Sequence, residues 1–171
     1  MICPTKNKLL ALFMFGLPVH AHALKTDREQ PIFVEAEEVV IDKQKGISRY
    51  RGNVRFKQGS LIIRGGTVLL YHKDGQLDKV VINGNPASFQ QSPDKGGIII
   101  MSQARKMEYI AKQSRLFLFE QARVSQGNNV FSGEKIEYDI IKGTVVAKRG
   151  ESDGSRINAI LEPDEPVQKI P

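Results

Sequence analysis

Few residues of this 171-residue chain are of types that could perform catalysis. Glu35, Glu37 and Glu38 form a cluster of carboxylates, and a glycosidase needs two carboxyl groups placed across a cleft. Glu35 and Glu37, however, would share one face of an extended strand, which is typical of solvated charges at a sheet edge. A serine-histidine-aspartate triad would have to use His72, which stands just before a Lys-Asp-Gly turn. We therefore expect no catalytic residues.

Metal ligands and cofactor motifs are equally sparse. Cys3, His20 and His22 lie in the first 23 residues, which leaves one histidine and no cysteine in the rest of the chain. A zinc site of the usual kind needs about four such ligands. No glycine-rich loop leads into a helix, as nucleotide-binding motifs require. The sequence predicts no metal, no cofactor and no enzymatic activity.

Any functional side chain must be positioned by the rest of the chain, whose pattern predicts short strands separated by turns. From Ile32 to Leu161, apolar runs recur about every ten residues and are broken by turn signals such as Asp74-Gly75. Ile136, Tyr138 and Ile140 alternate with charged residues, which indicates a strand with one buried face. This pattern predicts an all-β, antiparallel sandwich, barrel or jelly roll.

Two stretches of the chain are related by a fixed offset of 68 residues. Residues 36–71 can be laid over residues 104–139 without a gap, so that Gly59 falls on Gly127 and Gly65 falls on Gly133. Few paired residues are identical, but apolar positions fall on apolar positions and turns fall on turns. Both stretches are therefore predicted to be the same β unit, so that the domain consists of two related halves.

The two ends of the chain differ from its middle. Residues 1–23 combine two early lysines, an apolar run over residues 9–19 and a small-x-small site, which predicts a secretory signal peptide. We expect residues 24–162 to form one exported β domain and residues 163–171 to form a flexible tail. Beyond the signal, 25 − 2 = 23 basic residues exceed 19 acidic ones by 4. This excess favours an anionic partner, and for an exported chain phosphorylated lipid rather than nucleic acid.

Strand alternation directs a set of aromatic and branched side chains toward one face. If two sheets pack face to face, this set can simply fill the core. Alternatively the sheets part and leave a groove for acyl chains, each buried methylene contributing about 0.8 kcal/mol. Periodicity alone leaves both interpretations open. The predicted lipid-binding set is Ile32, Val34, Val39, Ile41, Phe56, Ile62, Phe89, Met107, Tyr109, Phe117, Val124, Ile136 and Tyr138.

Four segments, in their order and spacing, resemble the LptA/OstA-like family of periplasmic lipopolysaccharide-transport proteins. They are Gln-Pro-Ile-Phe-Val-Glu-Ala at 30–36, Gly-Asn-Val-Arg-Phe-Lys-Gln-Gly at 52–59, Asn-Pro-Ala-Ser-Phe at 85–89 and Gly-Glu-Lys-Ile-Glu-Tyr at 133–138. The resemblance covers nearly all of the chain beyond the signal. One departure is Glu120-Gln121-Ala122, where the family often shows a second Gly-Asn pair, and it leaves the shape of that bend open.

The resemblance implies a twisted, incompletely closed β-jelly roll in the periplasm. Its apolar interior would take the lipid A acyl chains of lipopolysaccharide for export and outer-membrane assembly, with Ile32, Phe89 and Tyr109 as groove-lining candidates by motif. Copies would stack head to tail through open edge strands near Ile32–Glu35 and Arg156–Leu161. Such a stack would bridge an LptC-like inner-membrane-anchored protein and an LptD-like outer-membrane protein. The rival interpretation is an exported structural or adhesive β protein with a filled core.

Overall fold

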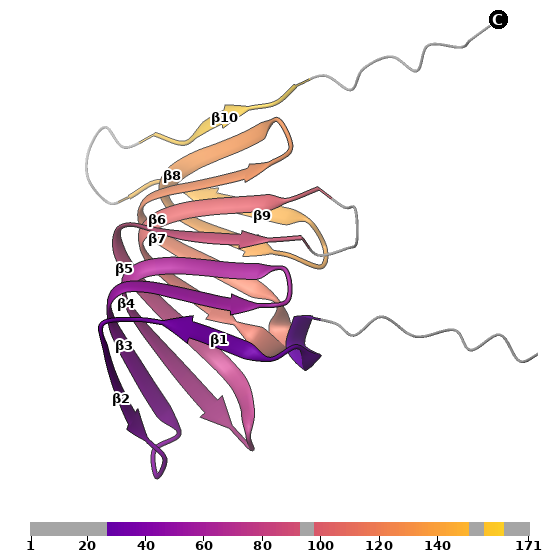
Figure 1. Ribbon diagram of the computed structural model, residues 1–171. Coiled ribbons are helices and arrows are strands. Elements are labelled where there is room, and N and C mark those ends of the chain that lie inside the picture. Colours follow the sequence, from indigo (N-terminus) through magenta and orange to yellow (C-terminus); the bar gives the residue numbers. More distant parts are fainter. Residues whose placement is uncertain (1–26, 93–97, 151–155, 163–171) are drawn as a thin grey trace, which may run out of the picture.

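The chain folds into one antiparallel β-sheet. The computed structural model describes residues 27–92, 98–150 and 156–162, and within them ten strands pair with one another (Figure 1). Short 3-10 turns, η1 (Asp27–Glu29) and η2 (Ala111–Gln113), precede the first strand and separate two later ones. The predicted all-β, antiparallel architecture is thereby confirmed. The strands are β1 (Ile32–Glu35), β2 (Glu38–Asp42), β3 (Ile47–Gln58), β4 (Leu61–Lys73), β5 (Gln76–Gln91), β6 (Ile100–Ile110), β7 (Arg115–Gln126), β8 (Asn129–Asp139), β9 (Thr144–Lys148) and β10 (Asn158–Ile160).

The sheet bends along one side into two layers. Register shifts interrupt the pairing of β3–β8 near the middle of the strands, for example between Arg51 and Val54 and between Phe119 and Ala122. Such bulges bend strands, and Figure 1 shows the long strands turning along the same side of the molecule. Layer I consists of β1, β10 and the halves of β3–β8 that pair in line with them. Layer II consists of β2, β9 and the other halves of β3–β8. The hairpin turns lie along the margin opposite the bend.

The backbone conformation at the bend supports the two related halves. Gly52 and Asn53 have φ of 77° and 43°, in the left-handed region. At an offset of 68, Glu120 and Gln121 have φ of 62° and 55°. The second pair therefore makes the same bend as the first, although its residues are of types that strongly disfavour this conformation. The departure in sequence noted above is not a departure in structure.

The strand bounds follow the same offset. β3 (Ile47–Gln58) falls on β7 (Arg115–Gln126), and the first residue of β4 falls on the first residue of β8. β1 and β2 fall on the two halves of the continuous strand β6. β9 and β10 likewise occupy the places next to β8 that the two halves of β5 occupy next to β4. The two halves thus share one topology, but the strands are continuous at the centre of the molecule and split at its ends.

The sheet does not close on itself. β1 and β2 stand at one end of the strand order and β9 and β10 at the other, and no pairing among the described residues joins these ends. The predicted incompletely closed jelly roll with open edges near both ends of the domain is therefore confirmed. None of the helices in the described ranges is long and apolar enough to cross a membrane. The predicted signal peptide and flexible tail lie outside the described residues.

The space between the layers is filled by side chains at the centre of the molecule. Phe56, Ile63, Ile82 and Leu118 expose none of their surface, and the surrounding apolar residues form one continuous core with them. The groove interpretation predicted an apolar trough standing open along this region. These side chains instead fill the space between the layers. They pack on one another because each layer covers the apolar face of the other.

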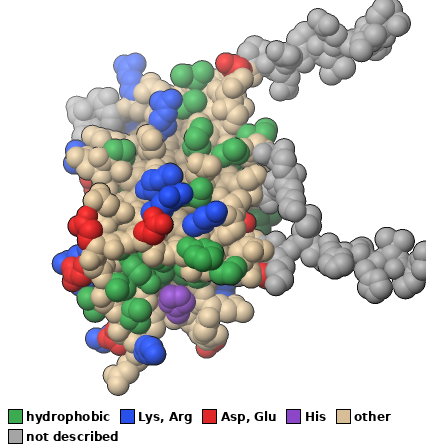
Figure 2. Space-filling model, viewed as in Figure 1, with side chains coloured by type: hydrophobic (Ala, Val, Ile, Leu, Met, Phe, Trp, Pro, Cys, Tyr) green, Lys and Arg blue, Asp and Glu red, His purple; other side chains and the backbone are tan. Residues whose placement is uncertain are grey.

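The interior face is less covered at the end formed by β1 and β2. Val39 and Ile41 expose 52% and 57% of their surface, although they stand directly opposite Tyr50 and Ser48 of β3 on the face that is buried elsewhere. Figure 2 shows hydrophobic side chains gathered at this end of the molecule. None of the strands in the described ranges covers them, so the apolar interior reaches the surface here.

Candidate functional site

The candidate site is the pair of apolar walls that face each other across the bent sheet. Strand pairing places the wall residues side by side in rows, one residue from each strand. The row of layer I, here called row I, consists of Val34, Phe56, Ile63, Phe89, Ser102, Val124, Phe131 and Ala159. The row of layer II, here called row II, consists of Ile41, Ser48, Leu70, Val80, Tyr109, Leu116, Tyr138 and Val145.

Most of the predicted lipid-binding residues lie on these walls. The aromatic rings of Phe89 and Tyr109, one from each layer, approach to 5.4 Å between centroids with their planes tilted by 53°. This contact is direct evidence that the two walls meet. A group of seven predicted residues is buried to at least 97%: Phe56, Phe89, Met107, Tyr109, Val124, Ile136 and Tyr138.

Four further predicted residues lie on the same face at the β1–β2 end. Val34 stands opposite Phe56 and packs against the core, whereas Ile32, Val39 and Ile41 are exposed. Their exposure follows from their position on the last strands of the sheet. A ligand or a second protein could reach these three wall residues without any movement of the layers.

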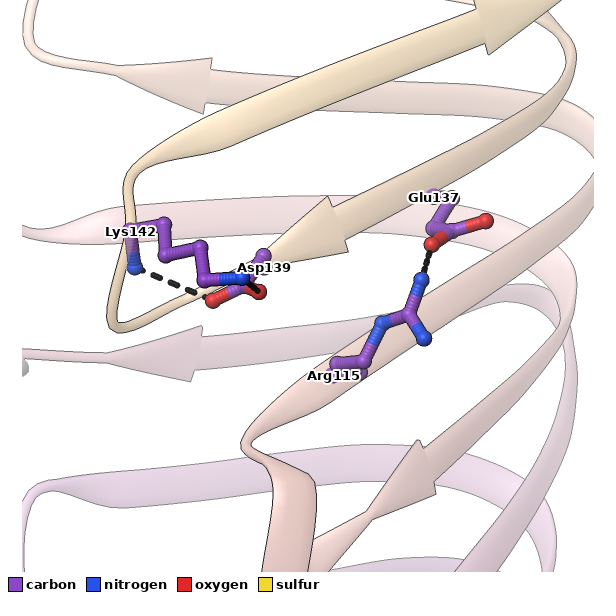
Figure 3. A network of polar contacts seen from close by, with 4 residues as sticks. All are labelled: Arg115, Glu137, Asp139 and Lys142. Atoms are coloured by element: carbon purple, nitrogen blue, oxygen red, sulfur yellow. Dashed lines mark hydrogen bonds and ion pairs between the residues drawn. The ribbon is translucent and has the colours of Figure 1, made fainter.

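Ile62 and Phe117 were assigned to the wrong face. Each lies between two buried neighbours in its strand, Leu61 and Ile63 in one case, and so points away from the interior. The Arg115 guanidinium stands 5.4 Å from the centre of the Phe117 ring, which covers this ring on the outer face. Arg115 also forms an ion pair with Glu137 on the neighbouring strand (Figure 3). The error arose because both stretches are apolar at consecutive positions, where alternation gives no phase.

The residues that alternate with Ile62 and Phe117 in those stretches point into the interior, and the prediction missed them. The clear alternation farther along the same strands could have identified them. The largest of the fully buried residues missed are Leu61, Ile63, Leu70, Ile82, Ile100, Leu116 and Leu118. Ser102 was also missed, because only the strand pairing shows that this polar residue stands between Phe89 and Val124.

Polar atoms occur within these walls without a partner. Among the described residues, the Oγ of Ser102, the Oη of Tyr138 and the Oε1 of Gln91 are buried and accept or donate no hydrogen bond. The Nε2 of Gln91 does have a partner, since it donates to Asp27 Oδ2 at 2.9 Å. Burial raises the pKa of the Tyr138 phenol, and the charge of Asp139 adds to this shift. The phenol is therefore protonated at neutral pH and is a hydrogen-bond donor.

The residues considered for catalysis do not converge. Glu35, Glu37 and Glu38 are exposed, and Glu37 accepts a hydrogen bond of 2.6 Å from Asn53 at the bend. His72 lines a surface hollow of about 430 Å³ together with two lysines and Asp74 at the margin of layer II. In the described part of the chain, no group of three or more His, Cys, Asp or Glu side chains could hold a metal ion.

One sequence motif for a nucleophile lies near the end of the domain. Residues 150–154, Gly-Glu-Ser-Asp-Gly, have the spacing of the serine elbow of α/β-hydrolases. An elbow of that kind leads from a strand directly into a helix. Residues 151–155 lie outside the described ranges, but residues 158–160, which follow, form strand β10. The context that would make this spacing meaningful is therefore not met.

The candidate site is therefore two facing apolar walls on an open antiparallel sheet. The comparisons with known proteins give the family to which this sheet belongs. The family model described as LptA/(LptD N-terminal domain) LPS transport protein matches residues 33–144. The chain belongs to this family.

Individual relatives extend the match over most of the chain. The lipopolysaccharide export system protein LptH of Pseudomonas aeruginosa is 36% identical over 154 residues, which cover 86% of this chain and 88% of LptH. The lipopolysaccharide export system protein LptA of Escherichia coli K12 is 28% identical over 93% of this chain and 85% of its own length. The crystal structure of LptH, the LptA-homologous periplasmic component of the Pseudomonas aeruginosa lipopolysaccharide transport device, superposes with a TM-score of 0.75 at 35% identity, covering 81% of this chain and all of LptH.

Proposed function

We propose that this protein is a periplasmic carrier that holds lipopolysaccharide by its lipid A acyl chains between the two walls of the bent sheet. Membership of the lipopolysaccharide-transport family is the observation that carries the proposal. The continuous apolar character of the walls supports it, because acyl chains need only apolar surface and each buried methylene contributes about 0.8 kcal/mol. No chemical step is involved, so the protein acts by binding and passing on its cargo.

The filled interior determines how the cargo enters. At the centre of the molecule the walls bury each other, so acyl chains must part the layers along the margin that carries the hairpin turns. Parting exchanges contacts between side chains for contacts with hydrocarbon, and the apolar area buried changes little. The uncovered wall at the β1–β2 end, with Val39 and Ile41, is the natural place for this exchange to begin.

The filled core also favours the rival function, an exported structural or adhesive protein that binds no lipid. The two functions are separated by a photocrosslinking residue placed at Ile41 or at Val40. These positions are adjacent and similarly exposed, at 57% and 53%, but they lie on opposite faces of β2. We expect lipopolysaccharide to crosslink to position 41 and not to position 40. Crosslinking at neither position, or equally at both, would contradict binding between the walls.

We further propose that copies of the chain associate head to tail, and the internal repeat supports this arrangement. β5 of the first half pairs with β6 of the second half at the centre of the molecule. β9 and β10 take the place of β5 at one end of the sheet, and β1 and β2 take the place of β6 at the other. The contact between two copies would therefore repeat the central contact within one copy.

The same equivalence fixes the expected register between copies. Asn83 pairs with Lys106 at the centre, which places Lys148 of one copy opposite Glu38 of the next. Gln90 pairs with Met101, which places Ile160 opposite Phe33. The first pair combines opposite charges. The second pair would bury two side chains that expose 59% and 63% of their surface in the single chain.

The free edges of such a stack would meet the membrane-bound partners. The β1–β2 edge and the β9–β10 edge remain available at the two ends, and they suit an LptC-like inner-membrane-anchored protein and an LptD-like outer-membrane protein that carry the same type of sheet. Strand addition to an open edge supplies main-chain hydrogen bonds, and matching side chains supply specificity. Glu38→Lys alters the β1–β2 edge and Lys148→Glu alters the β9–β10 edge. Each variant should lose binding to one of the two partner domains and keep binding to the other.

A further inference from the structure

The walls contain two hydroxyl groups that the fold does not use. Ser102 and Tyr138 are 2% and 0% exposed, and the Oγ of one and the Oη of the other make no hydrogen bond among the described residues. Ser102 stands in row I between Phe89 and Val124, and Tyr138 stands in row II between Leu116 and Val145. A buried hydroxyl without a partner is destabilising, so its presence in an apolar wall requires an explanation.

The internal repeat shows that the scaffold does not need these hydroxyls. At an offset of 68, Ser102 corresponds to Val34 and Tyr138 corresponds to Leu70. Val34 and Leu70 pack against the same core with aliphatic side chains. The first half of the molecule therefore builds both positions without a polar atom, and the hydroxyls are particular to the second half.

Both hydroxyls lie near the margin at which the layers would part. Ser102 is the third residue of β6 (Ile100–Ile110), and Tyr138 is the last but one residue of β8 (Asn129–Asp139). A lipid that enters tail first from this margin would leave its first carbonyl groups at that depth and send its methyl ends toward the bend. Each hydroxyl can donate one hydrogen bond, and an ester or amide carbonyl oxygen is an acceptor that cannot be satisfied by apolar walls.

We propose that Ser102 and Tyr138 are a polar subsite within the walls that binds the carbonyl oxygens linking acyl chains to the head group of the cargo. This inference rests on the proposed function, since it assigns a part of the lipid to particular atoms of that site. The subsite would set the depth at which the cargo is held. It would also favour acyl esters and amides over hydrocarbon of the same length.

The test compares wild-type protein with S102A, with Y138F and with the double variant, using purified lipopolysaccharide as the ligand. We expect each single variant to bind lipopolysaccharide about five-fold more weakly, which corresponds to one lost neutral hydrogen bond. In the infrared spectrum of the bound lipid, the ester carbonyl band should lie at lower wavenumber with wild-type protein than with the double variant. Y50F is the matched control, because Tyr50 packs half-buried against the same core in the first half.

The lipid-free proteins supply a second measurement. Since each hydroxyl lacks a partner in the fold, the melting temperature of S102A and Y138F should be unchanged or higher. A lower melting temperature would mean that the hydroxyl supports the fold, and unchanged lipopolysaccharide affinity or an unchanged carbonyl band would mean that it does not touch the lipid. Either result overturns the subsite. Failure of wild-type protein to bind lipopolysaccharide at all would instead contradict the proposed function, and the subsite with it.

Discussion

The centre and the two ends of the sheet are built from the same repeat, yet they differ in continuity. At the centre, β5 and β6 are long strands that cross the bend without interruption and bury their apolar faces. At the ends, the equivalent strands are split into β1 and β2 and into β9 and β10. Most of their apolar residues are exposed, although Val34, Val145 and Ala147 are half-buried against the core. A continuous strand links the two layers at the bend, whereas a split pair leaves each layer free to receive a strand independently. The comparison indicates a closed centre for stability and open ends for association.

The largest expected difference between centre and end concerns stability. Met107 in β6 is fully buried, and its equivalent Val39 in β2 exposes 52% of its surface. Met107→Ala should lower the free energy of unfolding by about 2–5 kcal/mol, because it leaves a cavity in a packed core. Val39→Ala should lower it by less than about 0.5 kcal/mol, as expected for an exposed site. Urea unfolding of dilute protein measures both, and similar losses would show that the centre and the end are not packed differently.

The next effect concerns association at the open ends. Lys148→Glu should weaken head-to-tail association about ten-fold, because it places like charges opposite each other in the proposed register with Glu38. Glu38→Lys should have a similar effect, and the double variant should restore association. Sedimentation velocity over a range of concentrations measures the change.

The same substitution contains its own control for folding. Within one chain, Lys148 pairs directly with Lys135, so Lys148→Glu replaces a like-charge pair on adjacent strands with an opposite-charge pair. The monomer should therefore be as stable as wild type or slightly more so. Failure of the double variant to restore association would refute the register inferred from the central contact.

The sequence predicted the repeated β scaffold well and the two walls only in part. An offset of 68 and clean alternation around Tyr138 were sufficient for the strands, because both signals are local or periodic. Ile62 and Phe117 were placed on the wrong face, because consecutive apolar residues carry no phase. Ser102 was not recognisable as a wall residue, because only the pairing of distant strands places it there. Whether the walls meet or part depends on three-dimensional packing, which periodicity does not encode.

A smaller effect is expected at the bend, where the two halves use different residues for the same backbone. Glu120 has φ of 62°, where its counterpart Gly52 has φ of 77°. Glu120→Gly should raise the free energy of unfolding by about 1 kcal/mol, because glycine adopts this region without steric cost. Gly52→Ala should lower the free energy of unfolding by at least as much, because its new Cβ would also meet the Glu37 carboxylate. Thermal unfolding of both variants measures this, and destabilisation by Glu120→Gly would show that the side chain itself supports the bend.

The smallest expected effect distinguishes the hairpins at the two ends. Both have the sequence Asp-x-x-Lys-Gly, and in each the aspartate accepts a hydrogen bond of 3.0 Å from the lysine backbone N–H and pairs with its ammonium group (Figure 3 for Asp139 and Lys142).

At the β2–β3 hairpin, the backbone hydrogen bond from Lys45, followed by its side chain, lowers the pKa of Asp42 below the ordinary value of 3.8. A lowered pKa in the folded state contributes stability that is complete above the unfolded value and is lost as pH falls through the folded value. The Asp42 carboxyl should therefore titrate below pH 3.8 in an NMR experiment, and the protection of the hairpin amides, corrected for the intrinsic pH dependence of exchange, should fall only below that pH. Asp42→Asn should remove this pH-dependent loss of protection and leave the β8–β9 hairpin unchanged. Because Asp42 is exposed to solvent, the change should be confined to the hairpin, and a titration midpoint at or above 3.8 would show that Lys45 does not hold this carboxylate.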